Sequence, residues 1–396
     1  MHWSDFLTLS LFWVTFVCII YVYAGYGVLL RFLSILFAPR THERQSINEC
    51  DLPQVTVLLT AFNEEAKLAK RLDNLLGQVY PKNRFRIVVA SDGSTDATDR
   101  IVADYAEKTG TVRLVASGGR LGKSGTQNLA MQDITDEIVV LTDSDTEFDH
   151  DYLRHIGAAF IDPQVGCVTA NLEFRAVDGS ISSSQGYYWN YEIRIRSLES
   201  ELGILAVASG QAMAFRRKLF RELPVNVGDD CIIPLDVVSA GAKTRFVEDA
   251  HAWDVMEHEP RREFNTRVRM TLRNWVGTWL HPQLLNPARN PGYAFSLWSH
   301  KLLRWLSGPL LFTLCGLGLY NGLAIEGHGF MFVAVVLFFC ATLAGWYLEG
   351  RPHAVPVVGS IFSFVLANLG FSIGLWKALS GDSVVTYQSG ESITKK

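Results

Sequence analysis

The sequence has few charged residues and no cysteine pattern that would build a metal or disulfide framework. Of its 396 residues, 19% are charged and 48% are hydrophobic, which is too apolar for an ordinary soluble protein. Its six cysteines include no Cys-x-x-Cys pair, so neither a zinc site of that type nor a disulfide framework is indicated. The formal net charge of −4 excludes a strong basic field, and no nucleic-acid partner is expected. A membrane protein with one sizeable water-soluble domain fits this composition.

Charge is absent from residues 6–30, near the N-terminus. A run of about 25 apolar residues is long enough to cross a bilayer core of roughly 30 Å. A cleaved signal peptide is the alternative, but it requires a basic start and a small-residue cleavage site, whereas this chain begins "MHWSD". We therefore expect residues 1–40 to form an uncleaved anchor. Arg31, Arg40 and Arg44 follow it, so the positive-inside rule places the next segment in the cytoplasm.

Three further apolar runs, at residues 306–325, 330–348 and 355–376, predict about three C-terminal transmembrane helices. Arg351 in a connection indicates the cytoplasmic side. This count places the tail, residues 377–396 with three lysines, on the opposite side, against the same rule. The alternative is that one run is re-entrant.

Residues 261–305 mix aromatic residues, prolines and cations. This pattern predicts amphipathic helices in the membrane interface, and a simple linker is the alternative. Together with the apolar runs, it predicts a multi-pass protein of the inner or plasma membrane that contacts membrane lipids.

The middle of the chain, residues 50–260, alternates short strand-like runs with helical patterns. The strand-like runs occupy residues 54–62, 85–92, 112–117 and 137–145, and helical patterns follow the first two, at residues 63–78 and 94–110. Such alternation predicts an α/β domain with a largely parallel sheet, here on the cytoplasmic side. Ligands of such sheets bind beyond the carboxyl ends of the strands, so we examined those ends.

Polar side chains follow each expected strand. Asn63 and Glu64 come after the first strand, Asp92 after the second, and Asp143 and Asp145 after the fourth. Taken singly, Asn63 reads as a helix cap and Asp92 as part of a turn. Taken together, they predict one ligand site at one edge of the sheet.

The loop "SGGRLGKS", residues 117–124, resembles a phosphate-binding P-loop without being one. That motif requires glycine where this chain has Ser117. A nucleoside triphosphatase is therefore not indicated. A glycine-rich loop with Arg120 and Lys123 still suits a diphosphate.

Asp143 and Asp145 place two like charges beside each other at the end of an apolar strand. Residues i and i+2 share one side of a strand, so both carboxylates are expected to face one cation. Hard oxygen ligands suit Mg²⁺ or Mn²⁺, which keep positions open for phosphate oxygens. The pair therefore predicts a divalent metal that holds the diphosphate of a sugar nucleotide.

Seven motifs occur in an order that resembles the membrane-integrated family 2 glycosyltransferases. The motifs, between about residues 55 and 275, are "TAFNEE", "VVASDGSTDAT", "GGRLGKSGTQN", "VLTDSD", "ASGQAMAFRRKLF", "VGDDCIIPLDVVSAGAKTRF" and "RVRMTLRNW". This group includes cellulose, chitin, hyaluronan and poly-N-acetylglucosamine synthases. The resemblance implies a GT-A fold, which is a Rossmann-like, mostly parallel α/β domain, accompanied here by transmembrane and amphipathic interface helices.

The resemblance also implies residue roles. On the donor side, Asn63, Glu64 and Asp92 would contact the nucleoside, Lys123 would lie near the nucleotide, and Asp143 and Asp145 match the metal-binding DxD motif. On the acceptor side, Asp230 of the acidic pair Asp229-Asp230 would be the general base, and Gly210 and Gln211 would line the acceptor pocket.

The chain departs from the family at one signature. Processive members carry Gln-x-x-Arg-Trp on the interface helix, whereas this chain has Arg269, Arg273, Asn274 and Trp275 and lacks the glutamine. Arg269 and Arg273 share a helix face and could bracket a diphosphate, or alternatively bind lipid headgroups. Trp275 lies about 200° around the helix from Arg273, so an acceptor-stacking role is disfavoured. This departure disfavours processive synthesis and favours the addition of a single sugar.

His251 in "EDAHAWD" is a candidate third metal ligand. A loop histidine held by ordinary hydrogen bonds is the favoured reading.

These observations predict an inverting, metal-dependent glycosyltransferase. It would move a sugar from a nucleotide-sugar, with UDP as the family-level expectation, to a lipid-linked or polysaccharide acceptor, forming a β-linkage for cell-surface polysaccharide. A processive synthase that translocates its product is the alternative with the same chemistry. An inactive nucleotide-binding scaffold is the alternative of another class. Donor sugar, linkage position and oligomeric state stay open.

Overall fold

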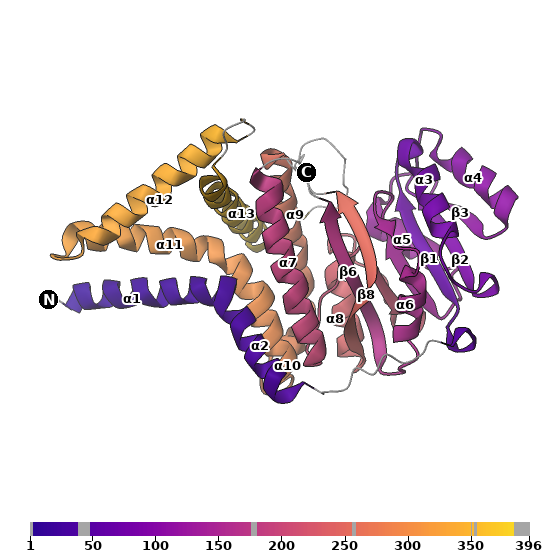
Figure 1. Ribbon diagram of the computed structural model, residues 1–396, viewed down its shortest axis with the longest axis horizontal. Coiled ribbons are helices and arrows are strands. Elements are labelled where there is room, and N and C mark those ends of the chain that lie inside the picture. Colours follow the sequence, from indigo (N-terminus) through magenta and orange to yellow (C-terminus); the bar gives the residue numbers. More distant parts are fainter. Residues whose placement is uncertain are drawn as a thin grey trace.

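An eight-stranded sheet forms the centre of one half of the molecule (Figure 1). The computed structural model describes residues 3–38, 48–175, 180–255, 259–349, 351 and 355–383. The strands are β1 (Val55–Ala61), β2 (Phe85–Ser91), β3 (Val112–Ala116), β4 (Ile138–Thr142), β5 (Glu147–Phe148), β6 (Val165–Arg175), β7 (Met213–Arg216) and β8 (Lys243–Val255). They lie in the order β3-β2-β1-β4-β7-β6-β8-β5. Strands β5 and β7 run antiparallel to their neighbours and the other strands share one direction, so the expected, mostly parallel α/β sheet is confirmed.

Helices cover both faces of the sheet. The first face carries α3 (Glu65–Leu76), α4 (Thr98–Thr109) and α6 (Tyr152–Ala159), and the second carries α5 (Gly122–Met131) and α8 (Asp229–Ser239). In β1, Val57 and Leu59 pack on the first face and Leu58 packs on the second. A strand buried on both sides needs a continuous apolar run, which is why this strand lacks the alternation of a half-exposed one.

The other half of the molecule is helical. Its elements are α1 (Trp3–Ile20), the π-helical turn η1 (Tyr21–Gly25), α2 (Tyr26–Phe37), α7 (Ser180–Glu201), α9 (Pro260–Trp279), α10 (Pro291–Ser296), the π-helical turn η6 (Leu297–Leu302), α11 (Leu303–Ala324), α12 (Gly329–Leu348) and α13 (Pro356–Leu379). Short 3₁₀ turns occur at Glu49–Asp51, Lys82–Arg84, Arg217–Leu219 and Pro282–Leu285. Four helical segments in the described chain are long and apolar enough to cross a membrane, and they contain α1, α11, α12 and α13.

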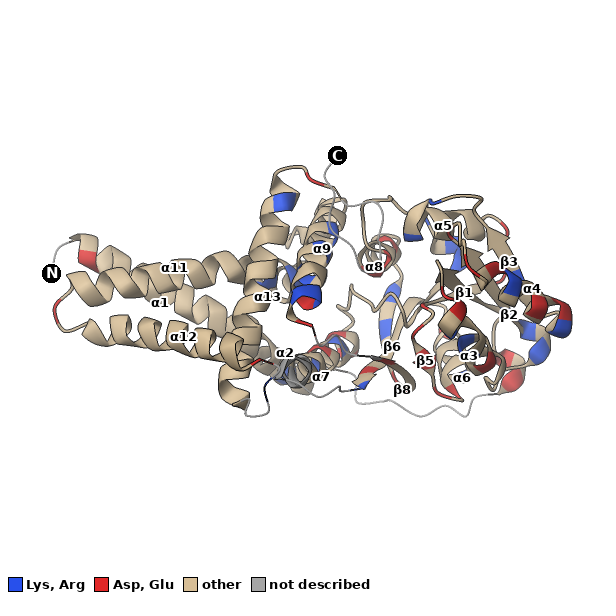
Figure 2. Cartoon of the chain, turned by 90° about the horizontal axis from the view of Figure 1, so that it is seen from above, with Lys and Arg blue, Asp and Glu red and all other residues tan. Residues whose placement is uncertain are grey.

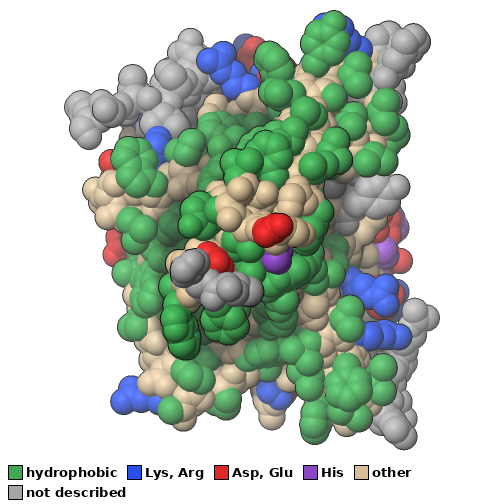
Figure 3. Space-filling model, turned by 90° about the vertical axis from the view of Figure 1, so that its left-hand side faces the viewer, with side chains coloured by type: hydrophobic (Ala, Val, Ile, Leu, Met, Phe, Trp, Pro, Cys, Tyr) green, Lys and Arg blue, Asp and Glu red, His purple; other side chains and the backbone are tan. Residues whose placement is uncertain are grey.

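Helices α1, α11 and α12 extend side by side away from the sheet (Figures 1 and 2). Their far ends meet where Leu9 packs with Ile325 and Met331. Seen from that end, the surface is mostly hydrophobic, with a few acidic side chains near its centre and basic ones toward its edges (Figure 3).

Helix α13 runs across the inner ends of α11 and α12 rather than alongside them (Figures 1 and 2). Its first turns meet α12 near Gly345, where an added Cβ would lie 2.2 Å from the carbonyl oxygen of Val358. Its later turns meet the start of α11, where Ser307 donates a hydrogen bond of 2.7 Å to Asn368. It also packs closely along α9, since a Cβ on Gly374 would lie 2.6 Å from the carbonyl oxygen of Val268.

A buried set of charges fastens α7 to η6 and α11; we call it the junction network. Its members are Glu192, Arg196, Glu199, His300, Lys301 and Arg304, all buried except the half-buried Lys301. Glu192 lies 2.9 Å from His300, 3.0 Å from Lys301, 3.2 Å from Arg196 and 3.3 Å from Arg304. Glu199 accepts hydrogen bonds from Tyr26 at 2.6 Å and Ser296 at 2.8 Å. The network therefore ties η6 and α11, and through Tyr26 also α2, to α7, the helix that follows β6.

Candidate active site

Asp143 and Asp145 stand at the carboxyl end of β4, where the sequence predicts a ligand site. Asp143 is half-buried and Asp145 is exposed, while Ser144 between them is buried. Each carboxylate has a cationic partner: Lys123 lies 2.8 Å from Asp143, and Lys67 of α3 lies 3.7 Å from Asp145. The expected like-charge repulsion is therefore relieved by lysines in this structure. The Lys67 pair is exposed and contributes little, because surface ion pairs are weak.

Lys123 joins the strand end to the acidic pair. Its ammonium lies 2.8 Å from Asp143 and 3.3 Å from Asp229, which begins α8. Burial opposes the charged form, but the two carboxylates prevail and raise the pKa of Lys123. Two carboxylates far apart in sequence thus share one cation, and the structure brings the DxD-like pair and the Asp229-Asp230 pair into one site. We call Lys123, Asp143, Asp145, Asp229 and Asp230 the strand-end site.

Asp229 and Asp230 are adjacent but have different environments. Asp229 is buried and accepts hydrogen bonds from the side chain of Gln127 at 2.9 Å and from the backbone N–H of Asp230 at 3.0 Å. Burial opposes its ionisation, but Lys123 and Gln127 lower the pKa of Asp229. Burial and the neighbouring Asp229 carboxylate raise the pKa of Asp230. A pair whose pKa values are pushed apart separates a permanent anion from a proton acceptor.

Asp230 lies in a crowded corner formed by two glycines. A Cβ on Gly210 would lie 3.1 Å from the Asp229 carboxylate and 3.4 Å from the Asp230 Cβ. A Cβ on Gly228 would lie 2.3 Å from the Asp230 carboxylate and 2.7 Å from the side-chain oxygen of Asn274. Side chains at these two positions would displace the acidic pair. Gly210 is therefore beside Asp230, and Gln211 donates a hydrogen bond to Asp254.

Asp92 holds the glycine-rich loop in place through hydrogen bonds. The buried carboxylate accepts backbone hydrogen bonds from Leu121 at 2.6 Å and Gly122 at 3.0 Å, and one from the Thr126 hydroxyl at 2.9 Å. Arg120 lies 3.0 Å from it and stacks on the Phe62 ring at 3.4 Å. These contacts fix the backbone that positions Lys123. A nucleoside contact of Asp92 stays a prediction.

Asn63 and Glu64 follow β1 and connect two loops. Asn63 has φ +55°, in the left-handed region, and accepts a hydrogen bond of 2.8 Å from the backbone of Thr95. Asparagine tolerates that backbone conformation better than most residues. Burial raises the pKa of Glu64, and the charges of Asp145 and Asp143 add to this rise. Glu64 therefore belongs to the acidic side of the strand-end site, whereas Asn63 holds the loop.

Arg273 reaches the site from α9. Its guanidinium donates to the carbonyl of Val227, just before α8, and lies 3.4 Å from the Ser124 hydroxyl. Its charge opposes the pKa rise of Asp230. Arg269 lies one helical turn earlier and is half-buried. The structure thus brings Arg273 near the acidic pair, and a diphosphate held between Arg269 and Arg273 stays a prediction.

Trp275 and His251 lie apart from these groups. Trp275 packs against Trp279 and Trp305 with ring centroids 5.9 and 6.1 Å apart, in an apolar cluster with α8 and α13 residues. His251 on β8 lies 2.8 Å from Glu173. The hydrogen bond agrees with the favoured reading, although His251 lies in strand β8 and not in a loop. In the described parts of the chain, no three His, Cys, Asp or Glu side chains are grouped to hold a metal.

Sequence reasoning missed three residues of the site. Lys67 pairs with Asp145, Gln127 donates to Asp229, and Asn274 lies against Gly228 beside Asp230. Lys67 and Gln127 each lie on a helix face that turns toward the strand ends, which periodicity alone does not identify. Asn274 had a signal, because it interrupts the arginine-tryptophan signature.

Comparisons with known proteins agree with this geometry. The family described as "Glycosyltransferase like family 2" matches residues 53–278. A beta-monoglucosyldiacylglycerol synthase from Nostoc sp. is 27% identical over 196 residues, which cover 47% of this chain and 40% of that protein. An N-acetylglucosaminyltransferase from Bradyrhizobium diazoefficiens is 23% identical over 304 residues, which cover 70% of this chain and 59% of that protein. The chain therefore spans between two fifths and three fifths of the length of these relatives.

One solved structure matches nearly the whole chain. The mannosyltransferase PcManGT from Pyrobaculum calidifontis, in complex with GDP-Man and Mn²⁺, superposes with a TM-score of 0.69 at 20% identity. The match covers 95% of this chain and 98% of that one. At this identity the likeness concerns the fold, which is GT-A.

Proposed function

The chain belongs to the family 2-like glycosyltransferases, and on that premise we propose that it transfers a sugar, with inversion, from a nucleotide-sugar to an acceptor at the membrane. The observation that supports this most is the bridge from Asp143 through Lys123 to Asp229. It holds Asp143 close to the Asp229-Asp230 pair, which supports a transfer between a diphosphate held at the end of β4 and Asp230 as the proposed proton acceptor. The acceptor is a lipid-linked sugar or a polysaccharide, as the membrane helices suggest.

The acidic side of the site fits a divalent cation. Asp143 and Asp145 supply oxygen donors, and Glu64 lies near them with a pKa raised by burial and, to a lesser extent, by their charges. Two carboxylates, with diphosphate oxygens and water, match the coordination habit of Mg²⁺ or Mn²⁺. A bound ion would neutralise the diphosphate as negative charge develops on it. The Mn²⁺ in the PcManGT complex is consistent with this assignment.

The other residues of the site have separate proposed roles in the reaction. Lys123 and Arg120 lie where they can pair with the diphosphate, and Asp229 holds Lys123 in place. Asp230 accepts the proton of the acceptor hydroxyl, for which a pKa raised toward neutrality is favourable. A bond forms from the acceptor oxygen to the anomeric carbon while the bond from that carbon to the diphosphate breaks. The electron pair leaves with the nucleoside diphosphate, so an α-linked donor gives a β-linked product.

Single addition is favoured over processive synthesis. The ring of Trp275 packs on Trp279 and Trp305 in a cluster of α8, α11 and α13 residues, which leaves it less suited to stacking on an acceptor sugar. The described chain has at most four candidate spans, and four helices from one subunit are few to enclose a path for product translocation. The length of products made in a single encounter distinguishes the two: one added sugar supports our proposal, and long chains contradict it.

We further propose that α1, α11 and α12 cross the membrane and that α13 lies in the interface. Helix α13 satisfies the length and hydropathy of a span, but it runs across the inner ends of α11 and α12 and packs along the arginine-rich α9 (Figure 2). Three crossings put the tail on the same side as the catalytic domain, which agrees with its lysines. Arg40, Arg44 and tail residues 384–396 lie outside the described residues.

The experiment that tests the activity is release of nucleoside diphosphate by detergent-purified protein given UDP-, GDP- and other nucleotide-sugars with Mn²⁺. A thermal-shift screen with the matching nucleoside diphosphates selects the base first, with UDP as the expected binder. We expect turnover in the wild type and in Asp133→Asn, a control at an exposed ion pair with Arg113. We expect none in Asp143→Asn. Binding without turnover in the wild type would support the inactive scaffold instead.

A further inference from the structure

The side chain of Asn274 lies beside Asp230 at the strand-end site. A Cβ added to Gly228 would lie 2.3 Å from the Oδ1 atom of Asp230 and 2.7 Å from the Oδ1 atom of Asn274. The two oxygens are therefore no farther apart than the sum of these distances, about 5 Å. Asn274 belongs to α9 and Asp230 to α8, and the missing side chain of Gly228 is what allows the two to lie so close.

Both side chains are available to a ligand. In the described chain, neither the Asn274 amide nor the Asp230 carboxylate has a hydrogen-bond partner, and both residues are half-buried rather than enclosed. The contacts that hold Asn274 in place use its backbone carbonyl, which accepts hydrogen bonds of 2.8 Å from the Thr278 hydroxyl and 3.6 Å from the Cys231 thiol. The side chain of Asn274 is therefore not needed for the packing of α9 on α8.

The two groups complement each other chemically. An ionised carboxylate only accepts hydrogen bonds, whereas an amide both donates and accepts them. Such bonds span about 2.8 Å, so two neighbouring hydroxyl groups of one sugar can reach both side chains together. The attacking hydroxyl gives its proton to Asp230 and directs a lone pair at the anomeric carbon, and a bond donated to it by Asn274 would weaken that attack. Asn274 therefore suits the neighbouring hydroxyl.

The amide stands where the chain offers no ring for stacking. Asn274 separates Arg273 from Trp275 in the sequence, and the Trp275 ring packs on Trp279 and Trp305. A ring binds the face of a sugar with little regard to its hydroxyl groups, whereas an amide bonds to a hydroxyl at one position. This arrangement favours recognition of an acceptor by its hydroxyl pattern.

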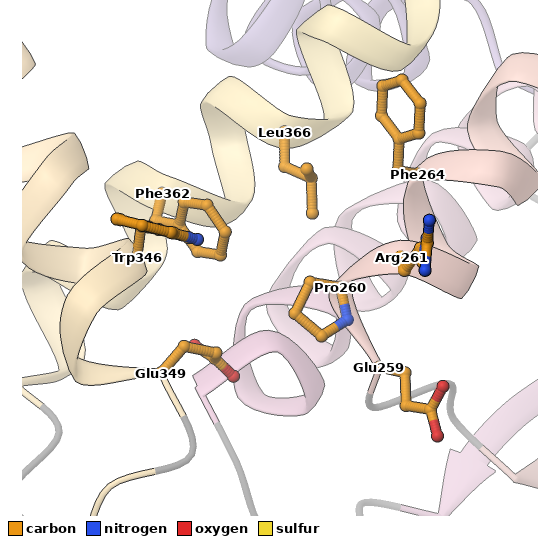
Figure 4. A pocket seen from close by; sticks show the side chains of 8 residues that line it. All are labelled: Glu259, Pro260, Arg261, Phe264, Trp346, Glu349, Phe362 and Leu366. Atoms are coloured by element: carbon orange, nitrogen blue, oxygen red, sulfur yellow. The ribbon is translucent and has the colours of Figure 1, made fainter.

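The start of α9 lines a pocket that lies too far away to serve this recognition. The pocket has a volume of about 720 Å³, and apolar side chains of α9, α12 and α13 face one another across it (Figure 4). Pro260 lines it, and Asn274 lies fourteen residues later, about 21 Å along the helix axis. Between the two places α9 and α13 are in contact, since a Cβ on Gly370 would lie 2.7 Å from the Arg267 Cβ. The reacting end of an acceptor is therefore recognised at Asp230 itself.

We propose that Asn274 selects the acceptor by bonding to the hydroxyl group that neighbours the attacking one. The attacking atom is then one of two neighbouring hydroxyl oxygens on a sugar, and not an oxygen of a lipid phosphate. This inference rests on the proposed function, because it names the acceptor chemistry of that transferase and the residue that recognises it.

Deoxy acceptors test the proposal directly. The probes are octyl β-glucoside and the four analogues that each lack one of its hydroxyl groups, assayed with the nucleotide-sugar that the wild type uses. We expect one analogue to be inert, because it lacks the attacked hydroxyl. We expect a second analogue, which lacks the hydroxyl nearest to the attacked one, to have a kcat/KM about tenfold below that of octyl glucoside, the effect of one hydrogen bond.

The variant Asn274→Ala separates recognition from structure. Its kcat/KM for octyl glucoside should fall about tenfold with an unchanged KM for the donor, and the penalty for removing the second hydroxyl should disappear. Arg262→Ala, at the exposed start of the same helix, is the control and should keep both the wild-type rate and the wild-type penalty. A merely structural role would lower kcat/KM for all active probes by one common factor, and that result would overturn the proposal.

The choice of acceptor is a second test. Transfer to a polyprenyl phosphate, or hydrolysis of the donor, in preference to every sugar probe would contradict the inference, because neither a phosphate nor water offers a pair of hydroxyl groups. Equal use of octyl glucoside and of all analogues that keep the attacked hydroxyl would contradict it as well.

Two provisions keep the outcomes distinguishable. If Asn274→Ala does not fold, Asn274→Ser retains a shorter hydrogen-bonding group and should give a smaller change in the same direction. If the wild type turns over no nucleotide-sugar, the proposed function fails, whereas turnover with an unaffected Asn274 variant contradicts this inference alone.

Discussion

The strand-end site and the junction network both gather carboxylates around cations, yet they differ in how completely the charges are compensated. In the junction network, buried Glu192 has His300, Lys301, Arg196 and Arg304 as partners, and its contacts with His300, Lys301 and Arg196 lower its pKa well below the usual range despite burial. In the strand-end site, Lys123 serves two carboxylates, and Asp230 has a raised pKa.

This difference separates structure from chemistry. A network in which each buried carboxylate already has several partners ties elements together. In the strand-end site, Lys123 links the end of β4 to the start of α8, and the half-buried Asp143 and exposed Asp145 are candidate metal ligands beside Asp230, the proposed proton acceptor. The predictions below test that separation, from the largest expected effect to the smallest.

Asp230→Asn should remove the proton acceptor and lower kcat by about 10²–10⁴-fold, the usual contribution of a general base. The fold should not suffer. Because burial and Asp229 raise the pKa of Asp230, ionised Asp230 costs stability at neutral pH. We expect an unchanged or higher melting temperature and retained nucleoside diphosphate binding. Full turnover in this variant, measured beside Asp133→Asn, would contradict the role of Asp230.

Glu192→Gln should have the opposite profile. Removing one partner of a buried ionic network leaves uncompensated cations and costs about 3–5 kcal/mol. We expect a clear drop in the melting temperature in detergent, while the turnover of the folded fraction keeps the wild-type metal dependence. A stable variant with altered kcat would mean that the junction network takes part in the reaction.

The pH dependence should show both members of the acidic pair. Turnover needs ionised Asp230, so the rate should fall as the pH drops through a value above 3.8, the ordinary value for Asp. Asp229 has a lowered pKa, so its stabilising contribution is present above 3.8 and is lost as the pH falls through its lower folded-state value. Initial rates over the acidic range measure the first effect, and melting temperatures over the same range measure the second. A rate that stays constant until the pH at which the protein unfolds would contradict a base with a raised pKa.

His251→Gln should have the smallest effect. His251 is part-exposed and bonded to Glu173, so we expect a stability change within about 1 kcal/mol and the wild-type concentration of Mn²⁺ for half-maximal rate. A tenfold weaker response to Mn²⁺ would place His251 among the metal ligands and enlarge the site.

The sequence predicts the strand-end site better than the junction network. Carboxyl ends of parallel strands converge at one edge of a sheet, so Asp92 and Asp143 could be placed together before any coordinates existed. The Lys123 bridge to Asp229 depends on how α5 and α8 pack, and local spacing does not encode that packing. The pair of Glu192 and His300, 108 residues apart, has no signal in periodicity.

The course of α13 shows the same limit in the membrane half. Hydropathy reports that residues 355–376 are apolar and long enough to span, but it reports no direction. The direction of α13 follows from contacts at Gly345, Gly370 and Gly374, because a glycine has no side chain and lets two helices cross closely. Such glycines can be recognised as points of helix contact only once the partner helix is known.

The central claim is that the carboxylates after β4 hold a divalent cation that the transfer reaction needs. The most direct measurement is the rate of nucleoside diphosphate release by chelator-treated protein as Mn²⁺ is added back, for the wild type and for the double variant Asp143→Asn/Asp145→Asn. We predict no release without the metal, full recovery in the wild type, and none in the double variant. Release without metal, or equal recovery in the double variant, would contradict the account.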